Sequence, residues 1–399
     1  MKNYIFLNTT IANIGGAEIY ISNKCKHLEE LGYNVMVISF EPGKIKLDNL
    51  KRFEPLIIPE LKLLYRRSNE KVRKKILNVI KSQNLVGQTI IESNIDNLNI
   101  WGEYLAKEIG AYHICYLLPE KNHLEKNDYY FYKFKFQQKS LFGIKANTIA
   151  DMMNDGLNYL ETQLSAVGCT NIPISAIEMT ELNQIKSADY TILSLGRLNK
   201  PYIISMLEGL SAFAKNNQNT KINILIVGGY STSDVDRKVS EIKNQNRNLD
   251  IYECGELYPI PRQIFDISDV AIAVAGCASI CNKQGLPTIT IDRNDHKGIG
   301  IYKRTTDNTT FRTEEPLLNL EDLLYDILIK KTFIKQTPQD SASINLDYSK
   351  HDLLLSIPSK FEYYNVSHRA VSFLDWFIKI TIIIVGFNAY NKFVSIIKR

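Results

Sequence analysis

Two stretches of strand length that end in polar residues constrain this chain more than any other feature. Residues 190–200 read YTILSLGRLNK, and residues 285–292 read GLPTITID. In an open α/β sheet, the groups that bind a ligand follow the ends of such strands. Arg197 and Lys200 together suit a diphosphate, because Arg presents a planar fork and Lys a point charge. The alternative is that both are ordinary solvated surface charges.

Strand-like and helix-like segments alternate along the chain. Residues 4–7 predict a strand, residues 17–31 a helix with one apolar face, and residues 35–40 the next strand. The same order recurs between residues 190 and 291. This alternation predicts an α/β fold built on doubly wound parallel sheets.

The length of the chain predicts two domains and a tail. A chain of 399 residues exceeds what one compact core usually holds, and its hydrophobic content of 45% is ample for two. We place one Rossmann-like domain at residues 1–185, a second at residues 186–340 and a helical tail at residues 341–399.

Charge and cysteine content narrow the class of protein. The net charge of +5 is too small to indicate a nucleic-acid-binding protein. The six cysteines form no C-x-x-C pair, so they predict free thiols in a reducing cytoplasm. The apolar run at residues 5–7 is too short for a signal peptide.

A pair of glycines precedes the first predicted helix. Gly15 and Gly16 would let a ligand approach the backbone, and the N–H groups of a first helical turn favour an anion. The loop lacks the G-x-G-x-x-G pattern of dinucleotide-binding domains, so we do not predict an NAD enzyme.

Taken in order, the motifs resemble those of GT-B glycosyltransferases, in particular the retaining family-4 enzymes that build bacterial surface polysaccharides. The resemblance covers nearly the whole chain. It is carried by Gly15-Gly16-Ala17-Glu18, Gly196-Arg197-Leu198 with Lys200, Gly228-Gly229, Gly255-Glu256-Leu257, and Asp269-Val270 leading to Gly285-Leu286-Pro287-Thr288. It implies a GT-B fold, in which two Rossmann-like domains face a central cleft and the tail packs on the first domain or on the membrane surface.

The resemblance also implies a donor site. Arg197 and Lys200 would act as catalytic residues on the diphosphate of a nucleotide sugar, because negative charge grows on the leaving phosphate as the glycosidic bond breaks. Backbone near Glu256 would meet the nucleotide base, with a plain turn as the alternative. The rest of the predicted donor site in these motifs is Gly15, Gly16, Gly196, Glu256 and Leu257.

The chain departs from the family just before the G-L-P motif. Family members usually carry two glutamates there, whereas residues 275–284 read AGCASICNKQ, with Ile280 in the place of the second glutamate. Both carboxylates are missing. As replacements we predict the helix-opening N–H groups from Gly276 to Ser279 as phosphate ligands and Asn282 as a neutral hydrogen-bonding group.

A histidine near the end of a late first-domain strand often contacts the sugar in this family. Here the predicted strand at residues 112–117 contains His113, which we expect to be a satisfied core residue. Glu120 and His123 follow in the next loop, so we predict Glu120 as a catalytic residue and His123, with Glu18, on the acceptor side. The alternative for the loop residues is simple solvation.

No metal or other cofactor is predicted, since the nucleotide sugar is a substrate. Asp234-Val235-Asp236 resembles a metal-binding D-x-D, but it opens a predicted helix. Acidic residues in a first turn complement the helix dipole, so a capping role is the better interpretation.

Two segments of the first domain suggest a membrane surface. Residues 62–81 hold eight basic residues against the single acid Glu70, with apolar residues between them. Residues 129–136 read YYFYKFKF, which mixes aromatic rings with cations. Nucleic acid is the alternative partner, because aromatic rings also stack on bases.

The tail has a third apolar segment at residues 371–387, which Asp375 and Lys379 interrupt. Its uninterrupted part is far below the roughly 20 residues that span a bilayer. Two interpretations remain open: a helix that packs on the first domain, or an interfacial anchor with the basic residues Lys392, Lys398 and Arg399.

These features predict a cytoplasmic glycosyltransferase that is peripherally associated with the inner face of the cytoplasmic membrane. It would move a hexose from a nucleotide diphosphate sugar to a lipid-linked saccharide, with retention, in capsular, exo- or O-antigen polysaccharide synthesis. One alternative is a nucleotide-sugar 2-epimerase, which needs carboxylates and histidines that are scarce here. The other is a catalytically degenerate paralogue that binds a nucleotide sugar or acts as a scaffold, because the glutamate pair is missing.

Overall fold

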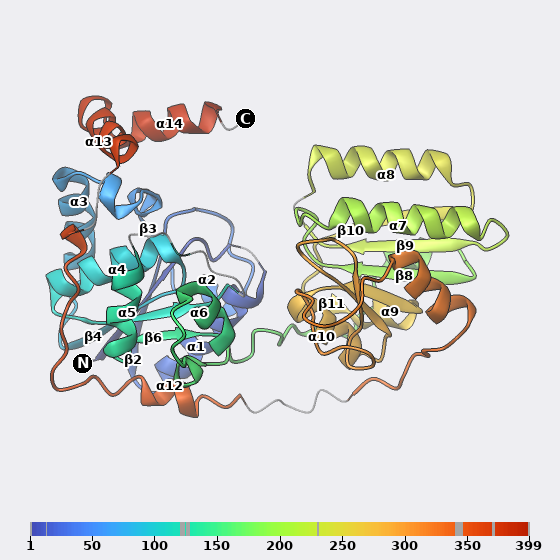
Figure 1. The fold of residues 1–399 in the computed structure, drawn as a ribbon, viewed down its shortest axis with the longest axis horizontal. Coiled ribbons are helices and arrows are strands. Elements are labelled where there is room, and N and C mark those ends of the chain that lie inside the picture. The colour runs from blue at the N-terminus through green and yellow to red at the C-terminus, as the bar shows by residue number, and fades with distance from the viewer. Residues whose placement is uncertain are drawn as a thin grey trace. The chain divides into compact units, whose positions relative to one another are not determined.

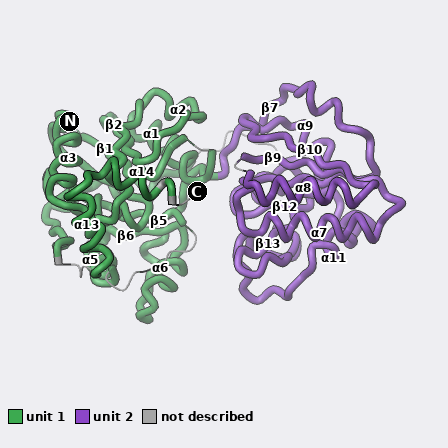
Figure 2. The backbone as a smooth tube through the Cα atoms, turned by 90° about the horizontal axis from the view of Figure 1, so that it is seen from above, with its two compact units in different colours: residues 1–169, 345–399 green, residues 170–344 purple. Residues whose placement is uncertain are grey.

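The computed structural model describes residues 2–12, 14–119, 124, 128–229, 231–339, 346–368 and 372–397. The chain forms two compact units, one of residues 1–169 with 345–399 and the other of residues 170–344 (Figure 2). Strands and helices alternate along each unit (Figure 1).

The first unit is built on a six-stranded parallel sheet in the order β3-β2-β1-β4-β5-β6. The strands are nearly continuous apolar runs, as strands covered by helices on both faces should be. They are β1 (Lys2–Asn8), β2 (Tyr33–Ser39), β3 (Leu56–Ile57), β4 (Gln88–Ser93), β5 (Tyr112–Leu117) and β6 (Leu141–Gly143). The helices are α1 (Gly16–Glu30), α2 (Asp48–Lys51), α3 (Glu70–Lys81), α4 (Asp96–Ile109), α5 (Tyr129–Gln137) and α6 (Ala146–Met153).

The second unit repeats this plan with the order β10-β9-β8-β12-β13-β14. Its last pair, β13 with β14, is antiparallel, so this sheet is mixed. The strands are β8 (Tyr190–Leu195), β9 (Ile222–Val227), β10 (Leu249–Gly255), β12 (Val270–Ala273), β13 (Thr288–Ile291) and β14 (Gly298–Ile301). The helices are α7 (Ile203–Asn216), α8 (Ser233–Gln245), α9 (Arg262–Asp266), α10 (Ala275–Lys283) and α11 (Leu320–Leu324). The predicted α/β fold class with two Rossmann-like sheets is confirmed.

The division between the units lies before the predicted boundary at residue 185. Strand β7 (Ile174–Ser175) pairs with β11 (Ile260–Pro261) of the second unit. Leu182 packs in the same apolar cluster as Leu193. Residues 170–185 therefore belong to the second unit, because β7 and Leu182 make their contacts there.

The C-terminal segment returns to the first unit through α12 (Ser349–Leu353), α13 (Phe373–Val385) and α14 (Phe387–Ile397). His351 is buried, and its Nε2 lies 2.8 Å from the carbonyl oxygen of Ser165. Further along, the backbone N–H of Tyr364 donates to Glu103 at 2.7 Å. The tail is thus tied to the first unit by polar contacts as well as by apolar packing.

A buried ion pair lies inside the first unit. Lys24 of α1 and Glu92 of β4 are 2.5 Å apart and almost inaccessible to solvent. Burial alone raises the pKa of Glu92, but the charge of Lys24 and hydrogen bonds from Lys24, Tyr4 and Asn94 lower it overall. Such a pair is tolerated because its hydrogen-bonding capacity is satisfied, and loss of either partner would leave a buried charge.

The structure contradicts the membrane interpretation of residues 129–136. These residues form helix α5 instead of an alternating surface segment, and Phe131, Tyr132 and Lys135 are buried in the first unit. A helix turns every 3.6 residues, so rings at neighbouring positions point in different directions and several of them enter the core. Only Tyr130 among the rings of this segment is largely exposed.

The basic segment at residues 62–81 also uses its apolar side for folding. Helix α3 buries Val72, Ile76, Leu77 and Ile80 in the core of the first unit. Its lysines face outward. The apolar residues of α3 are therefore not available to a membrane, whereas its charges are.

Two buried histidines should make the stability of the first unit depend on pH. Burial, together with the charges of Lys135 and Lys24 respectively, lowers the pKa of His113 and of His351 to about 4 from the ordinary 6.5. The unfolded chain therefore takes up these protons first, and the free energy of unfolding falls as pH drops from about 6.5 towards 4. Between about pH 7 and about pH 5 we expect a loss of roughly 2 kcal/mol for each histidine.

The measurement is urea unfolding of the wild type and of His351→Gln at both pH values. The Gln amide can still donate to Ser165, so the variant should fold and should lose roughly half of the pH dependence. An unchanged pH dependence in the variant would show that His351 takes up its proton in the folded state.

Candidate functional site

The carboxyl ends of β8, β9 and β10 are held together by backbone contacts between glycine-containing loops. The N–H of Gly196 donates to Val227, and that of Gly228 donates to Gly255 at 2.8 Å. A Cβ atom on Gly228 would lie 1.8 Å from the carbonyl oxygen of Gly196. Gly196 itself has φ +149°, a conformation that favours glycine. Only glycine at position 228 permits this approach.

Arg197 and Lys200 lie in the loop that follows β8. In the sheet, β8 lies between β9 and β12, and the chain leaves β9 and β12 towards opposite edges. This is the topological switch point, where open α/β sheets bind ligands. Arg197 is exposed and Lys200 half-buried.

Helix α10 begins directly after β12, which pairs with β8, so its first turn lies at the same edge of the sheet as these two cations. Burial raises the pKa of the Cys277 thiol to about 11, and the charges of Arg197 and Lys200 act on the same thiol in the opposite direction. Tyr202 is buried in the same group, and burial raises its pKa while Arg197 opposes the shift. Two cations and a helix N-terminus therefore meet at the switch point of the second sheet.

Helix α10 is suited to an anion at its start. Its N-cap residue, Val274, has no side chain that could accept a hydrogen bond from the first turn. Gly276 and Ser279 are half-buried and lie in the first two turns. Asn282 lies about 9 Å farther along the axis than Gly276, near the other end of the helix.

The turn after β10 reaches the same edge of the second sheet. A Cβ atom on Gly229 would lie 3.2 Å from Oε2 of Glu256, so this carboxylate lies over the glycine loop after β9. Leu257 packs partly buried against an apolar cluster of the second unit. Glu256 and Leu257 therefore lie at the same edge as Arg197, as the predicted donor site requires.

In the first unit, Gly15 and Gly16 begin α1 after β1, next to β4 at the switch point of the first sheet. The side chain of Glu18 folds back over this start, since a Cβ atom on Gly15 would lie 2.7 Å from its Oε2. An acidic side chain here complements the helix dipole. An added Cβ atom at Gly16 would make an ordinary contact with Cys169 at 3.6 Å, so close packing does not require glycine there.

The predicted residues Glu120 and His123 lie outside the described residues. His113 is a satisfied core residue, as predicted. Its Nδ1 lies 2.7 Å from Glu103 and its Nε2 lies 2.8 Å from the hydroxyl of Ser93. This order resembles a nucleophilic triad, but all three side chains are fully buried, and the Ser93 hydroxyl donates to Asn99 at 2.6 Å. The group is part of the core and has no access to a substrate.

The acidic residues at the start of α8 serve as helix-terminal charges. The N-cap of α8 is Thr232, whose side chain accepts a hydrogen bond from the N–H of Val235. Asp234 and Asp236 lie in the first turn, where they complement the dipole. Among the residues that the structure describes, no three His, Cys, Asp or Glu side chains form a group that could hold a metal ion.

Sequence reasoning missed Tyr202 and Cys277 as neighbours of the two cations. Both follow motif residues closely, Tyr202 after Lys200 and Cys277 after Gly276. Their residue types did not indicate a place in the site, because Tyr and Cys are common core residues. Only the adjacency of β8 and β12 brings them to one place.

Comparison with known proteins establishes the fold. A glycosyltransferase from Rickettsia africae ESF-5 is 17% identical, covers 83% of this chain and 89% of its own, and has a TM-score of 0.53. WaaG, a glycosyltransferase involved in lipopolysaccharide biosynthesis, is 12% identical, with coverages of 82% and 91% and a TM-score of 0.51.

The chain has the GT-B fold. A UDP-GlcNAc 2-epimerase from Neisseria meningitidis also matches, at 11% identity over 74% of this chain and 84% of its own. Its TM-score of 0.40 is too low to support an inference. No family model and no curated protein matches the sequence. At these identities the likeness concerns the fold and leaves the reaction open.

The contact at Gly228 provides a test of the loop geometry. We expect Gly228→Ala to lower the free energy of unfolding by about 3 kcal/mol or more, because the added methyl group meets a backbone oxygen that cannot move away alone. The matched control is Gly229→Ala, in which the methyl group meets only the flexible side chain of Glu256 and should cost less than about 1 kcal/mol. Denaturant unfolding of both variants measures the difference, and equal costs would contradict this description of the loops.

Proposed function

We propose that this protein is a glycosyltransferase that uses a nucleotide diphosphate sugar as donor. The observation that carries the proposal is the meeting of Arg197, Lys200 and the start of α10 at the switch point of the second sheet. The GT-B fold shared with two glycosyltransferases supports it.

The geometry explains how the donor would be held. Arg197 can form two parallel hydrogen bonds with phosphate oxygens, and Lys200 adds a second positive charge from the same loop. The first N–H groups of α10 would donate hydrogen bonds to a phosphate oxygen. The bare backbone at Gly228 lets the loop after β8, which carries both cations, pack against the loop after β9.

These groups would act on the leaving group. When the bond between the sugar and the diphosphate breaks, negative charge develops on the phosphate oxygen that departs. Two fixed cations and a helix dipole lower the energy of that charge more than the energy of the bound donor, so they lower the barrier. No metal is part of this proposal, because the cations supply the charge.

The finer parts of the proposal rest on the resemblance in the sequence. They are transfer of a hexose with retention, a lipid-linked saccharide as acceptor, and a role in capsular, exo- or O-antigen polysaccharide synthesis. The site would then work in the cytoplasm at the inner face of the membrane, where such acceptors are held.

Donor binding is tested by thermal and denaturant unfolding with a panel of nucleotide diphosphates and their sugars. A ligand at about 100 times its dissociation constant should add roughly 2.7 kcal/mol to the stability of the wild type. Arg197→Ala loses charged hydrogen bonds worth about 1.5–3 kcal/mol, so the same ligand should add only about 0.3–1.3 kcal/mol to this variant.

The matched control is Lys215→Gln, which removes one positive charge at the far end of α7 from the site. It should respond to the ligand as the wild type does. If no nucleotide in the panel stabilises the wild type, or if Arg197→Ala responds equally, the assignment of the donor site is wrong.

Turnover separates the proposal from its two alternatives. With a stabilising donor and a membrane-lipid extract as acceptor, we expect release of the nucleoside diphosphate and transfer of labelled sugar to lipid, both reduced in Arg197→Ala. Conversion of the donor to its 2-epimer without acceptor would indicate an epimerase. Binding without either reaction would favour the scaffold.

A further inference from the structure

The helix pair α13–α14 exposes a large apolar surface. Its exposed hydrophobic side chains are Phe373, Leu374, Trp376, Phe377, Ile383, Ile384, Val385, Phe393 and Ile396. Soluble proteins rarely leave so many large apolar side chains together in water. We call this set the apolar face of α13–α14.

The apolar face is held on the first unit by an ion pair with two arginines. Asp375, the only acidic residue between 372 and 397, is 2% exposed. Its carboxylate lies 2.8 Å from Arg66 and 2.5 Å from Arg67, and it also takes part in a capping box with Ser372. The contact therefore fixes α13 in place and also removes the one negative charge from the outer surface of the pair.

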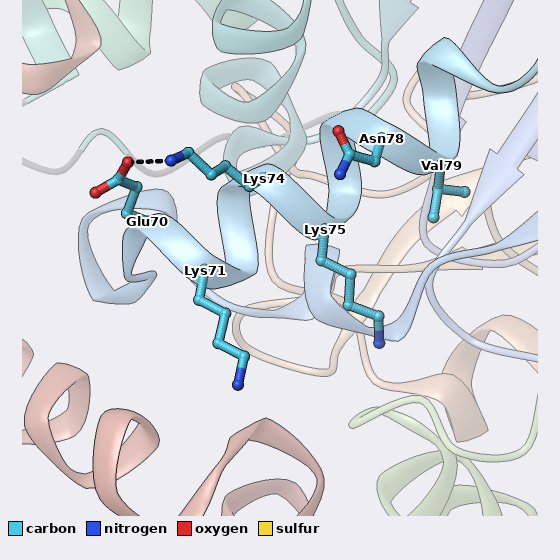
Figure 3. A pocket seen from close by; sticks show the side chains of 6 residues that line it. All are labelled: Glu70, Lys71, Lys74, Lys75, Asn78 and Val79. Carbon is cyan, nitrogen blue, oxygen red and sulfur yellow. Dashed lines mark ion pairs between the residues drawn. The ribbon is translucent and has the colours of Figure 1, made fainter.

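The basic side of α3 lies next to this anchor. Arg66 and Arg67 belong to the short 3-10 helix Tyr65–Arg67, which α13 contacts and which directly precedes α3. Figure 1 shows α13 beside α3, and Figure 2 agrees from a second direction. Figure 3 shows the outward side chains of Lys71, Lys74 and Lys75 along α3.

These lysines give the surface a positive charge. Lys71 has no ion pair with any residue that the structure describes. Lys74 pairs with Glu70 at 2.7 Å, but both side chains are at least 70% exposed, so water screens this pair strongly. Lys75 pairs with the buried carboxylate of Glu60.

We propose that the apolar face of α13–α14, with the lysines of α3 beside it, docks on a lipid bilayer that contains anionic lipids. An apolar face that is rich in aromatic residues and carries no exposed acid, with lysines beside it, is the combination that binds at the level of the headgroups. The apolar side chains would enter the boundary with the acyl chains, and the lysines would contact the headgroups.

The shape of the pair suits a surface position. Helix α13 has 13 residues, about 20 Å of helix, which is shorter than the hydrocarbon core of about 30 Å. No single helix among the described residues is long and apolar enough to cross a membrane. Residues 373–385 and 387–394 pass that test only as a pair, bent by 120° at Gly386, where φ is +82°. This bend lets both helices lie along one surface.

The inference is independent of the donor site, which lies in the other unit. It assigns the apolar contact with the membrane to the tail, whereas the sequence pattern assigned it to residues 129–136. Of the predicted tail cations, Lys392 is exposed, whereas Lys398 and Arg399 lie outside the described residues.

Sedimentation of the full chain with vesicles tests the inference. We expect it to bind vesicles of phosphatidylcholine with phosphatidylglycerol more tightly than vesicles of phosphatidylcholine alone, and less tightly as salt is raised. Lys71→Gln with Lys74→Gln should weaken binding to the anionic vesicles about 25-fold, about five-fold for each charge, with little effect on the neutral ones. The control Lys330→Gln breaks a similar i,i+4 pair, with Asp326 at 2.8 Å in the second unit, and should have no effect.

The apolar contact is tested separately. Phe373→Ser with Phe377→Ser should weaken binding to both kinds of vesicle by about ten-fold or more. The control Leu317→Ser removes a side chain of the second unit that is 70% exposed and should bind normally. All the variants change exposed side chains, so they should fold.

Fluorescence gives a direct reading of the contact. The chain has two tryptophans, and Trp101 is fully buried, so a blue shift on addition of anionic vesicles should come from Trp376. Trp376→Phe should abolish the shift.

Three outcomes would overturn the inference. They are no binding to anionic vesicles, binding that is insensitive to the two phenylalanines, and a dimer in solution that the same double variant turns into monomers without any vesicle binding. The last outcome would show that a second copy of the chain covers the face. Arg197→Ala should bind vesicles as the wild type does, and the phenylalanine variant should keep its response to nucleotides, so this inference and the donor proposal can fail separately.

Discussion

The contact between two glycine loops at the carboxyl edge of the second sheet is the constraint on which the candidate site depends. Because Gly228 has no side chain, the loop after β9 approaches the carbonyl oxygen of Gly196, and the loop after β8 is held against it. Arg197 and Lys200 extend from this loop, so their positions follow from a backbone contact and from the order of strands. A site built this way fixes the backbone that carries both cations before a ligand arrives, which would favour the proposed electrostatic stabilisation of a leaving group.

The first unit depends on a different interaction, in which buried charged side chains form ion pairs and hydrogen bonds. Lys24 of α1 forms a buried ion pair with Glu92 of β4. The hydroxyl of Tyr20 forms hydrogen bonds with this pair and also lies 3.4 Å from Nδ1 of His351 in the tail. Asp375 makes another contact farther along the tail, with two arginines that precede α3. If the tail moved away, the Asp375 contact would leave a buried carboxylate and two arginines unpaired and the His351 contact would lose its hydrogen bonds, so the tail is held against this unit. This attachment gives the apolar face of α13–α14 a fixed position beside the lysines of α3.

Much of the fold could be predicted because parallel sheets leave a strong local signal. Runs such as residues 190–195, 222–227 and 288–291 are apolar and β-branched, and the strands have these bounds in the structure. The segment at residues 129–136 misled us, because a membrane-facing surface and a helix packed into a core can share an aromatic and basic composition, and only packing distinguishes them. The antiparallel strand β14 was also missed, since residues 298–301 contain two glycines and form a strand by pairing with β13.

For the candidate site, local sequence determined which residues are charged, where the glycines fall and that Arg197 and Lys200 follow the end of a strand. Only the tertiary structure decided that β12 lies next to β8, which brings the start of α10, with Cys277, to the two cations. Strand order depends on contacts between residues far apart in the chain, and no local pattern records them. The same reason applies to the tail: its apolar composition is visible in the sequence, but the burial of Asp375 by two arginines distant in the sequence decided which of its side chains face outward.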